Sequence, residues 1–491
     1  MNKIGRFFWF RYDVRSLSYL GYFVDKEHWV VGTNPVNSSF NDLMRINAHT
    51  LGCKLNNAET STIVEQFRSR NWEVTSDSSN ADVFVLNTCS VTSNAERECR
   101  QIIRRVLREN PNTFIAVTGC YAQLRPEEIA SINGVDVVLG AKEKLNIFSN
   151  ISDFVKSDTP KIFSSEIDEA TDFHIAATAD TSERTRAFLK VQDGCDYTCT
   201  YCTIPMARGV SRSTEINDIL LEARRLSRDG FGEIVLSGVN VGDFGAKTGS
   251  SFFELVQALE YDNEVTARIR ISSIEPNLLT DEIIDLVASS KKFCPHFHIP
   301  LQSGSDTVLK LMQRRYNTSL YRERIAKVKQ AMPHCGIGVD VIVGFPGETE
   351  EDFLKSFEFL TELDISYLHV FTYSERPNTK AVSMKLPVPK DIRKKRNAQL
   401  RILSEKKLQA FYRLQIGSVA TVLFEDESNM ISTTREGFTE NYVRVVVPNM
   451  LALNAQTATV KLREISDDGV VADLIEIVNI RAESTLLPIL Q

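Results

Sequence analysis

The sequence predicts a multidomain α/β protein with an N-terminal parallel sheet domain, a central partial (β/α)6 barrel and a C-terminal small antiparallel β-barrel. Strand-like apolar runs alternate with helical stretches over the first two regions, which is typical of parallel sheets covered by helices. The central region holds six such βα units, too few for a closed eight-stranded barrel. After Gly417 short strands and polar turns follow one another without helices, which favours a small β-barrel.

The composition limits the kind of protein. A chain of 491 residues is long enough for about three domains. With 43% hydrophobic and 25% charged residues it is typical of a globular protein, and we expect no transmembrane helix. The net charge of −7 argues against binding nucleic acid through the overall field, so RNA binding must rely on local basic patches.

The first 43 residues differ from the rest of the chain. They hold ten aromatic residues and show neither a sustained period nor the order of a signal peptide. A clean strand-like run, MRINAHTLGC, then begins at Met44. We therefore expect Met44 to be the natural start and residues 1–43 to be a non-native or disordered extension. A genuine variable N-terminal arm is the alternative.

Residues 44–150 are predicted to form the N-terminal sheet domain. Its strand-like runs are RINAHT (45–50), DVFVLNT (82–88), FIAVTG (114–119) and VDVVLG (135–140). Helical stretches lie between them, near 57–70, 93–109 and 126–132. The chain then becomes rich in Asp, Ser, Thr and Glu, so residues 151–185 are predicted to be a linker.

Residues 186–383 are predicted to form the partial barrel. Its strands are expected at 187–192, 233–238, 268–273, 296–301, 338–343 and 367–373. Its helices are expected at 214–228, 251–260, 280–289, 318–331 and 350–362. Residues 384–413, with ten Lys or Arg against two acidic residues, are predicted to form a basic helical connector, and the small β-barrel is expected over 414–482.

The strongest chemical signal is the run CDYTCTYC. It places Cys195, Cys199 and Cys202 in a CxxxCxxC array after the first strand of the partial barrel. Thiolates hold iron–sulfur clusters, and a short loop can wrap three of them round one cluster. Because only three ligands are local, one iron of a four-iron cluster would stay open for reaction, as in catalytic zinc sites. The alternatives are a zinc knuckle that lacks its fourth ligand, since no histidine is near in sequence, and three buried thiols.

This array, with Tyr201 just before its last cysteine, resembles the cluster loop of the radical S-adenosylmethionine superfamily. The resemblance implies that the open iron binds the amino and carboxylate groups of S-adenosylmethionine, which an electron then cleaves to a 5′-deoxyadenosyl radical. The segments LSGVN, SSIEP, PLQSGSD and DVIVGFPGETEEDF, each near a strand end, agree with it. Glycine would let the backbone approach the cofactor, and polar side chains would hydrogen-bond it. The candidate cofactor-binding residues are Tyr201, Gly238, Ser273, Glu275 and Gln302.

A second set of cysteines lies in the first domain. Cys53, Cys89 and Cys120 each follow a predicted parallel strand by one to three residues. The carboxyl ends of parallel strands share one edge of a sheet, so three distant cysteines could converge there on a second cluster. Each alone would more often be a buried small hydrophobe, and the repeated placement is what favours a cluster. The three other cysteines lack this placement and are predicted to be structural thiols: Cys99, Cys294 and Cys335.

The combination of the three regions resembles the methylthiotransferase family, from Met44 to about residue 480. The resemblance implies two 4Fe-4S clusters and a C-terminal TRAM domain that holds the substrate. It also implies that one S-adenosylmethionine gives a methyl group and a second gives the radical that removes hydrogen from the target carbon. A methylthio group then joins that carbon. No catalytic residue beyond the clusters is assigned.

Two short strings indicate the substrate. TLGCKLN and GVNVGDFG (238–245) most resemble the branch that acts on C2 of N6-threonylcarbamoyladenosine beside the anticodon, at position 37 of tRNA. One alternative branch acts on isopentenyladenosine in tRNA and usually has Gln where Val239 stands, and another acts on a ribosomal-protein aspartate. An alternative of a different class is a non-catalytic iron–sulfur RNA-binding or cluster-carrier protein.

Two basic stretches are candidates for RNA binding, because phosphate contacts supply most sequence-independent affinity. They could instead be solvated helix faces. Residues 415–481 contain five basic and ten acidic residues. This excess of negative charge argues against a barrel that binds RNA through phosphate contacts alone, and the alternative is that the barrel binds a basic partner. The candidate RNA-binding residues are Arg97, Arg104, Arg105, Arg393, Lys394 and Lys395.

The nine cysteines also bear on the compartment. An odd count in a large chain without a secretory signal favours reduced thiols, hence a cytoplasmic protein. The expected partners are tRNA, S-adenosylmethionine and an electron donor of unknown identity, with no membrane.

Overall fold

The computed structural model describes residues 43–90, 93–167, 172–178, 185–425, 434–448 and 455–480. The predicted extension, apart from its last residue, lies outside the described residues. Within the described part, no helix has the length and apolar character needed to cross a membrane.

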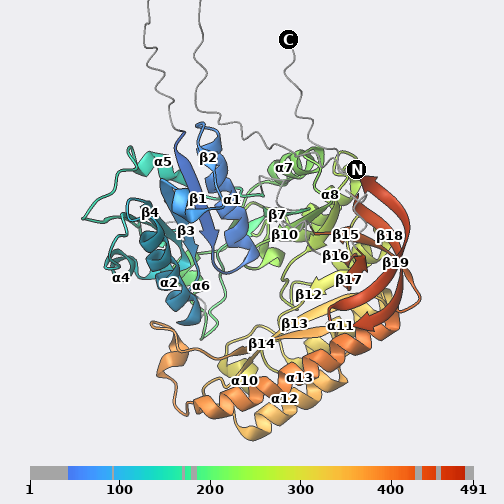
Figure 1. Ribbon diagram of the computed structural model, residues 1–491. Helices are drawn as coiled ribbons and strands as arrows, with labels where there is room; N and C mark the ends of the chain where they lie inside the picture. Colours follow the sequence, from blue (N-terminus) through green and yellow to red (C-terminus); the bar gives the residue numbers. More distant parts are fainter. Residues whose placement is uncertain are drawn as a thin grey trace, which may run out of the picture. The chain divides into compact units, whose positions relative to one another are not determined.

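The N-terminal domain is a parallel sheet of six strands in the order β2–β1–β3–β4–β5–β6 (Figure 1). The strands are β1 (Arg45–Thr50), β2 (Glu73–Val74), β3 (Val83–Thr88), β4 (Phe114–Gly119), β5 (Val137–Leu139) and β6 (Lys161–Phe163). Every residue of β3, β4 and β5 is buried, as expected for parallel strands covered on both faces.

Short helices and two longer ones connect these strands. They are α1 (Lys54–Arg68), η1 (Ser78–Asn80), α2 (Ser93–Glu109), α3 (Cys120–Leu124), α4 (Pro126–Ala130), η2 (Lys144–Asn146) and α5 (Ile147–Asn150). One core cluster joins Leu86 and Val117 to Ile103 of α2, and another joins Ile46 and Val85 to Phe67 of α1. The two clusters lie on opposite faces of the sheet, because neighbouring residues of a strand point to opposite sides.

The sheet extends into the stretch predicted as a linker. β6 pairs with β5 through Val138 and Ile162, so the boundary expected at residue 150 comes before the last strand. β6 has only three residues, KIF, of which two are exposed. Such a short run carries no apolar pattern that would separate it from its polar surroundings.

The central region holds six parallel strands in two groups, β7–β10–β11 and β12–β13–β14. A bridge between Ser273 and His298, with a 3.0 Å hydrogen bond from the Ile274 amide to the His298 carbonyl, joins the groups. One hydrophobic core runs through both. The strands are β7 (Arg186–Lys190), β10 (Glu233–Ser237), β11 (Arg268–Ile271), β12 (His296–His298), β13 (Gly336–Val343) and β14 (Tyr367–Thr372).

Helices follow these strands and cover the outside of the array (Figure 1). They are α6 (Ile204–Arg208), α7 (Ile216–Arg228), η4 (Val241–Asp243), α8 (Phe252–Tyr261), α9 (Asp281–Ser289), α10 (Asp306–Leu311), α11 (Thr318–Ala331), α12 (Glu350–Glu362) and η5 (Lys380–Ser383). A two-stranded ribbon of β8 (Gln192–Asp193) and β9 (Arg212–Ser213) brackets the loop that carries the CxxxCxxC array.

The basic stretch predicted as a connector is one long helix, α13 (Lys390–Gln415). It packs against β14 and buries Leu400 and Leu403 in the central core. Arg393 and Arg396 are buried as well. The helix is therefore an integral part of the central region.

The C-terminal strands close into a barrel in the order β15–β16–β17–β19–β18. They are β15 (Val419–Phe424), β16 (Thr434–Thr439), β17 (Arg444–Pro448), β18 (Ala455–Ser466) and β19 (Gly469–Ile480). All neighbours are antiparallel except β17 and β19, which run parallel through Val445–Val470 and Val446–Val471. The expected purely antiparallel barrel is corrected here, since directions cannot alternate all the way round a closed ring with an odd number of strands.

This barrel is attached to the central array through the turn before β17. Arg270 donates to the carbonyls of Thr439 and Glu440 at 3.3 and 2.8 Å. Tyr442, in the left-handed region at φ 72°, stacks on His296 with ring centroids 4.5 Å apart. The aromatic ring thus lies against the first residue of β12.

Candidate functional site

The three loop cysteines lie between β8 and α6, each with its sulfur in a polar contact. Cys195 Sγ accepts from the Tyr197 amide and Cys202 Sγ from the Ile204 amide, both at 3.4 Å. Cys199 Sγ accepts from Arg314 Nη1 at 3.1 Å. Burial raises the pKa of Cys195 and of Cys202 to about 12. These raised pKa values favour the protonated thiol. A bound metal would favour the thiolate instead, because only the thiolate is a ligand.

The spacing of the thiols suits a cluster better than a single ion. Zinc holds sulfur at about 2.3 Å, which would bring three sulfurs within roughly 4 Å of one another. Among the described residues, the potential ligand atoms that lie within 4.8 Å of one another are those of His298, Asp340 and His369. The three loop sulfurs do not form such a group, so they are too far apart to share one zinc ion. The chemistry of the three donors therefore fits an iron–sulfur cluster.

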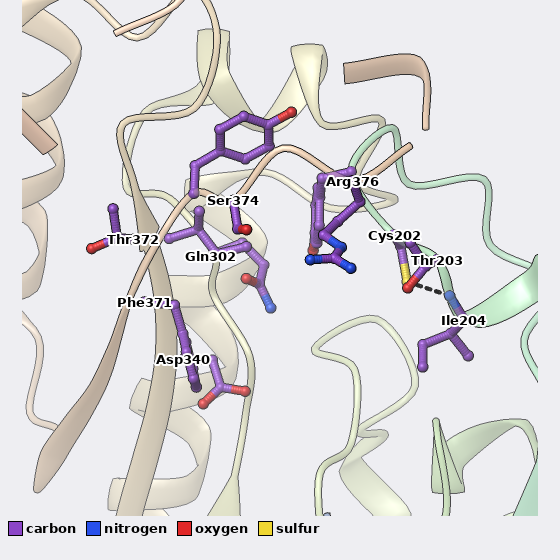
Figure 2. Close-up of a pocket in the computed structure, with 12 residues that line it drawn as sticks. Cys202, Thr203, Ile204, Gln302, Asp340, Phe371, Thr372, Ser374 and Arg376 are labelled. Carbon is purple, nitrogen blue, oxygen red and sulfur yellow. Dashed lines mark hydrogen bonds between the residues drawn. The ribbon is translucent and has the colours of Figure 1, made fainter. Parts of the chain in front are cut away.

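A cavity of about 230 Å³ opens beside Cys202 (Figure 2). It runs from the cysteine loop to the carboxyl ends of β13 and β14, where barrel enzymes hold their ligands. Its lining combines apolar walls with a few polar groups, as small-molecule sites do. Among its lining residues are Tyr201, Cys202, Gln302, Asp340, Phe371 and Arg376.

The structure divides the five candidate cofactor residues. Tyr201 and Gln302 line the cavity, and Gln302 takes the left-handed conformation at φ 68°. Glu275 pairs with Arg314. Ser273 Oγ lies 3.0 Å from His298 Nδ1.

Gly238 is tightly surrounded in the turn after β10. A side chain at this position would come within 3.0 Å of Gln192 Oε1 and 3.1 Å of Val241 Cγ1. Gly238 is not among the residues that line the cavity. Gly238 permits close packing of the turn after β10, and its role in approaching the cofactor stays a prediction.

Two arginines of this site were missed by sequence reasoning. Arg314 reaches Cys199, Glu275 and, at 3.3 Å, the Tyr201 hydroxyl. Arg376 lines the cavity and pairs with Glu96 of α2 in the N-terminal domain. Arg314 stands in the triplet RRY and Arg376 in ERP, and neither setting has a period or spacing that points to the cysteines.

The other three candidate ligands occupy the carboxyl edge of the N-terminal sheet. Cys53 caps α1 after β1, while Cys89 follows β3 and Cys120 begins α3 directly after β4. These strands are neighbours in the order β1–β3–β4. Gly52 has φ 104°, and a side chain there would come within 2.8 Å of Cys89 Cβ. The loop of Cys53 therefore passes directly against Cys89.

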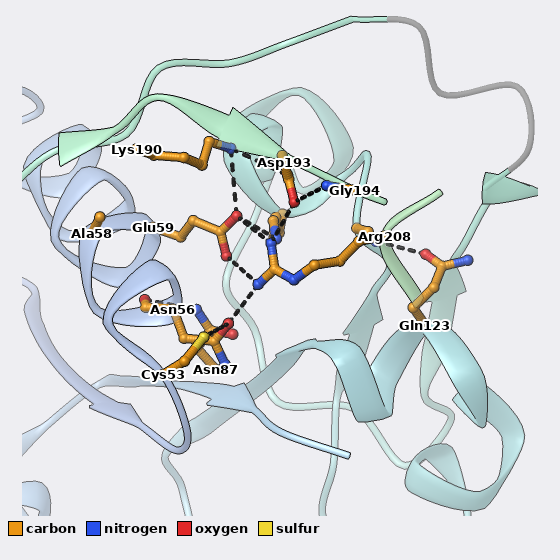
Figure 3. A network of polar contacts seen from close by, with 12 residues as sticks. Cys53, Asn56, Ala58, Glu59, Asn87, Gln123, Lys190, Asp193, Gly194 and Arg208 are labelled. Carbon is orange, nitrogen blue, oxygen red and sulfur yellow. Dashed lines mark hydrogen bonds and ion pairs between the residues drawn. The ribbon is translucent and has the colours of Figure 1, made fainter. Parts of the chain in front are cut away.

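A buried ionic network lies behind Cys53 and links the two α/β domains (Figure 3). Glu59 of α1 contacts Arg208 at 3.1 Å, Lys144 at 2.7 Å and Lys190 at 3.4 Å. Arg208 also pairs with Asp193 at 2.9 Å and donates to Asn56 Oδ1 at 2.6 Å.

Arg208 connects this network to the first cysteine set. Burial raises the pKa of the Cys53 thiol, and the nearby charge of Arg208 partly offsets this effect. Asn56 in turn donates to the carbonyl of Leu51, two residues before Cys53, and to that of Thr88, which directly precedes Cys89. Arg208, itself paired with Asp193, thus connects the loop that holds Cys195, Cys199 and Cys202 to Asn56, which holds the loops of Cys53 and Cys89.

The RNA-binding candidates fall into two groups. The side chains of Arg97, Arg104, Arg105, Lys394 and Lys395 are exposed. Arg393 is buried, donates to the carbonyls of Val388 and Tyr373 and pairs with Glu375. Its predicted role in RNA binding is therefore wrong, because its guanidinium fastens α13 to the loop after β14.

The three remaining cysteines are buried. Cys99 lies on the buried face of α2, in the same core cluster as Cys89, and burial raises its pKa to about 12. Cys335 belongs to the central core, and Cys294 Sγ lies 3.9 Å from Glu233.

Comparisons with known proteins agree with this geometry. Residues 45–140 match the Uncharacterized protein family UPF0004, and residues 189–360 match the Radical SAM superfamily. The threonylcarbamoyladenosine tRNA methylthiotransferase MtaB of Bacillus subtilis is 40% identical over 405 residues, which cover 81% of this chain and 89% of that protein. The tRNA-2-methylthio-N(6)-dimethylallyladenosine synthase of Methylacidiphilum infernorum is 32% identical, over 81% of this chain and 88% of that protein.

A solved structure supports the fold alone. The radical S-adenosylmethionine methyltransferase TsrM of Kitasatospora setae aligns with a TM-score of 0.50 at 13% identity, covering 69% of this chain and 77% of that one.

Proposed function

This chain belongs to the radical S-adenosylmethionine methylthiotransferase family, and we propose that it converts N6-threonylcarbamoyladenosine in tRNA to its 2-methylthio derivative. The observation that carries the proposal is the pair of cysteine triads, each at the carboxyl edge of its own parallel strands, with the cofactor cavity beside one of them. The family uses two 4Fe-4S clusters and S-adenosylmethionine. The higher identity to the threonylcarbamoyladenosine enzyme than to the dimethylallyladenosine one favours this base.

The loop triad would hold the cluster that binds S-adenosylmethionine. When bound, these two groups supply the radical that abstracts hydrogen from the substrate. Cys195, Cys199 and Cys202 would provide three thiolates and leave one iron open. Arg314 would stabilise the thiolate of Cys199, and Tyr201 with Gln302 would orient the cofactor in the cavity.

Cys53, Cys89 and Cys120 would hold the second cluster, where the family handles the sulfur to be inserted. Arg376 lies between the two regions, because it lines the cavity while its Glu96 partner belongs to α2, the helix that follows Cys89. A buried ion pair at this position would fix the distance between the sulfur source and the substrate carbon.

The C-terminal barrel would be the TRAM domain that holds the tRNA, in a cytoplasmic enzyme. The exposed residues Arg97, Arg104 and Arg105 of α2, and Lys394 and Lys395 of α13, would contact phosphates.

Two cysteine substitutions test the assignment in the anaerobically reconstituted enzyme. Cys199→Ala should abolish 5′-deoxyadenosine formation, because one iron of the cofactor-binding cluster loses its thiolate. Cys89→Ala should keep 5′-deoxyadenosine formation and lose methylthiolated tRNA, both measured by mass spectrometry of nucleosides. Full methylthiolation by Cys89→Ala would refute the second cluster, and a wild-type enzyme that forms no 5′-deoxyadenosine would point to a cluster carrier.

A further inference from the structure

Three potential metal ligands that neither proposed cluster uses lie on one face of the central strands. His298 ends β12, Asp340 lies in β13 and His369 in β14, and these three strands are neighbours. Asp340 and His369 are register partners, and His298 pairs with Gly338, two residues before Asp340. Because every second residue of a strand points to the same side, the three side chains share one face of the sheet. We call them the His–Asp–His group.

This face of the strands opens to the cofactor cavity. Asp340 and Ile342 line the cavity, whereas Val341 between them is buried in the hydrophobic core. Figure 2 shows the carboxylate of Asp340 among the side chains that surround the cavity. An ion held by the His–Asp–His group would therefore lie at the wall of the cavity.

The ligand atoms of the group are close enough together to share one ion, since they all lie within 4.8 Å of one another. His298 Nε2 and Asp340 Oδ1 are 2.9 Å apart. Two ligands at right angles, each about 2.1 Å from a metal ion, are roughly 3.0 Å apart. This pair thus has the spacing of neighbouring metal ligands, although a hydrogen bond alone gives the same distance.

His369 favours a metal ion over a hydrogen-bonded pair. Its ring centroid lies 5.4 Å from that of His298. Among the described residues its ring nitrogens have no hydrogen-bond partner, although one of them lies within 4.8 Å of both other ligand atoms. The side chain is exposed, so a rotation of the imidazole can bring this nitrogen onto an ion that the other two residues hold.

The second nitrogen of His298 has the kind of partner that a metal-bound histidine needs. Its Nδ1 lies 3.0 Å from Ser273 Oγ. With an ion on Nε2, Nδ1 would carry the hydrogen and donate it to this hydroxyl. Metal-bound histidines almost always donate their other N–H to a nearby acceptor, which fixes the orientation and the tautomer of the ring.

We propose that His298, Asp340 and His369 bind one divalent first-row transition-metal ion at the wall of the cofactor cavity. Two imidazole nitrogens select such an ion over Mg²⁺ and Ca²⁺, which take oxygen ligands. Three protein ligands leave the other positions of the ion open, as in catalytic zinc sites and in iron sites with two histidines and one carboxylate. Because Asp340 lines the cavity, these positions are accessible to a molecule bound there.

Manganese(II) tests this site in the full-length enzyme with both clusters reconstituted and loosely bound metal removed by a chelator. The enzyme is kept anaerobic and without reductant, because oxidised 4Fe-4S clusters have no paramagnetic signal that overlaps with that of Mn²⁺. Electron paramagnetic resonance should show one Mn²⁺ bound per chain, with spin-echo modulation from the nitrogens of two imidazoles. Zn²⁺ should displace it, because nitrogen and oxygen sites bind Zn²⁺ more tightly than Mn²⁺.

Substitutions then locate the ion. Ser273→Ala keeps all three ligands and should weaken Mn²⁺ binding about ten- to a hundred-fold, as loss of a hydrogen bond to a ligand does. Asp340→Asn and His369→Gln each change a ligand and should weaken it further, and His369→Gln should leave the modulation of one imidazole. His334→Gln is the matched control, because His334 is an exposed histidine outside the group, and it should bind Mn²⁺ as wild type does. Wild-type iron content in each variant shows that the clusters and the fold are intact.

Two results would overturn the proposal. They are the absence of stoichiometric Mn²⁺ and Zn²⁺ binding at millimolar concentrations, and wild-type binding by both Asp340→Asn and His369→Gln, since the ion would then lie elsewhere. Nucleoside analysis keeps this proposal apart from the proposed function. An enzyme that methylthiolates tRNA but binds no further metal ion refutes only the metal site, whereas one that binds the ion but makes no methylthiolated tRNA refutes only the proposed function.

Discussion

At the scale of single residues, Arg314 is the side chain on which the cofactor site depends most. Its guanidinium contacts the sulfur of Cys199, the hydroxyl of Tyr201 and the carboxylate of Glu275, with 4% of its side chain exposed. A cation in so dry a setting acts on a neighbouring thiolate with little screening. Arg314 would therefore belong to the electrostatic surroundings of the proposed loop cluster, although it is not one of its proposed ligands.

Arg314→Met should leave iron content intact but make the loop cluster harder to reduce. All three thiols remain, while the reduced cluster, which carries one more negative charge, loses a buried positive neighbour. Redox titration followed by electron paramagnetic resonance should show a more negative midpoint than in wild type. The control is Arg315→Met, since Arg315 is exposed and lies over the Tyr197 ring at 3.9 Å. Equal midpoints for Arg314→Met and Arg315→Met would contradict the assignment.

At the scale of elements, α1 connects the two α/β domains. Its Glu59 is fully buried and contacts Arg208, Lys144 and Lys190, which come from three other segments. Burial alone would raise the pKa of Glu59, but the three cations outweigh it and lower the pKa to about 2. Buried charges are tolerated only when they are paired, so this helix can pack here only if all partners are in place.

Glu59→Gln should destabilise the apoprotein by about 3–5 kcal/mol at pH 7, because it leaves buried cations without their counter-ion. A carboxylate with a lowered pKa contributes its stability above its ordinary value of 4.5 and loses it as pH falls toward 2. The difference in unfolding free energy between Glu59→Gln and wild type should therefore be constant near neutral pH and shrink below about pH 4.5. Urea unfolding at a series of pH values measures it.

Glu65→Gln is the control for this prediction, on the same helix. Glu65 is half-exposed and its contact with Arg68 is 3.7 Å long, so its loss should cost less than about 1 kcal/mol. The role of Glu59 would be disproved if both variants unfolded at the same urea concentration at pH 7.

The individual strands also differ in how well the sequence predicts them. The strands β3 and β4 could be found within one residue, because both of their faces are buried and they read as continuous apolar runs. β6 could not be predicted, because its three residues carry no apolar pattern and are defined as a strand only by their pairing with β5. The six cysteines could be proposed as cluster ligands for a similar reason, because residue type and the position after a strand are both visible in the sequence, and their role as ligands stays a prediction.

The partners of those cysteines could not be predicted. Arg314 and Cys199 are 115 residues apart, and Arg376 and Glu96 are 280 apart. No local period connects such positions. The burial of Arg393 was missed for a related reason. A basic residue in a basic helix gives no indication that its side chain will donate to the carbonyls of Val388 and Tyr373.

At the scale of the whole molecule, the C-terminal barrel contributes to the central array itself. Tyr442 stacks on His296 and on Phe438, with Arg270 lying over its ring at 4.9 Å. His298, which pairs with Asp340 of the cavity lining, lies two residues further along β12. The barrel therefore supports the strand that carries His298, in addition to any contact it makes with tRNA.

Tyr442→Ala should loosen this attachment, with a loss of roughly 2–4 kcal/mol in unfolding free energy. Hydrogen exchange should increase in β12 and β16 and remain unchanged in the N-terminal sheet. Tyr442→Phe keeps the stacking surface and should behave like wild type. Wild-type exchange rates in Tyr442→Ala would show that the ring does not hold the barrel in place.

The ion pair between Glu59 and Arg208 also has a consequence for synthesis, because 149 residues separate its partners. On the ribosome the first sheet can leave the exit tunnel with Lys144 already made, while Lys190 and Arg208, the other two partners of Glu59, are still untranslated. The nascent chain must therefore wait, with this face of α1 hydrated, until α6 emerges. Metal loading of the first cysteine set would come after that moment, so maturation should proceed only once both halves have been made.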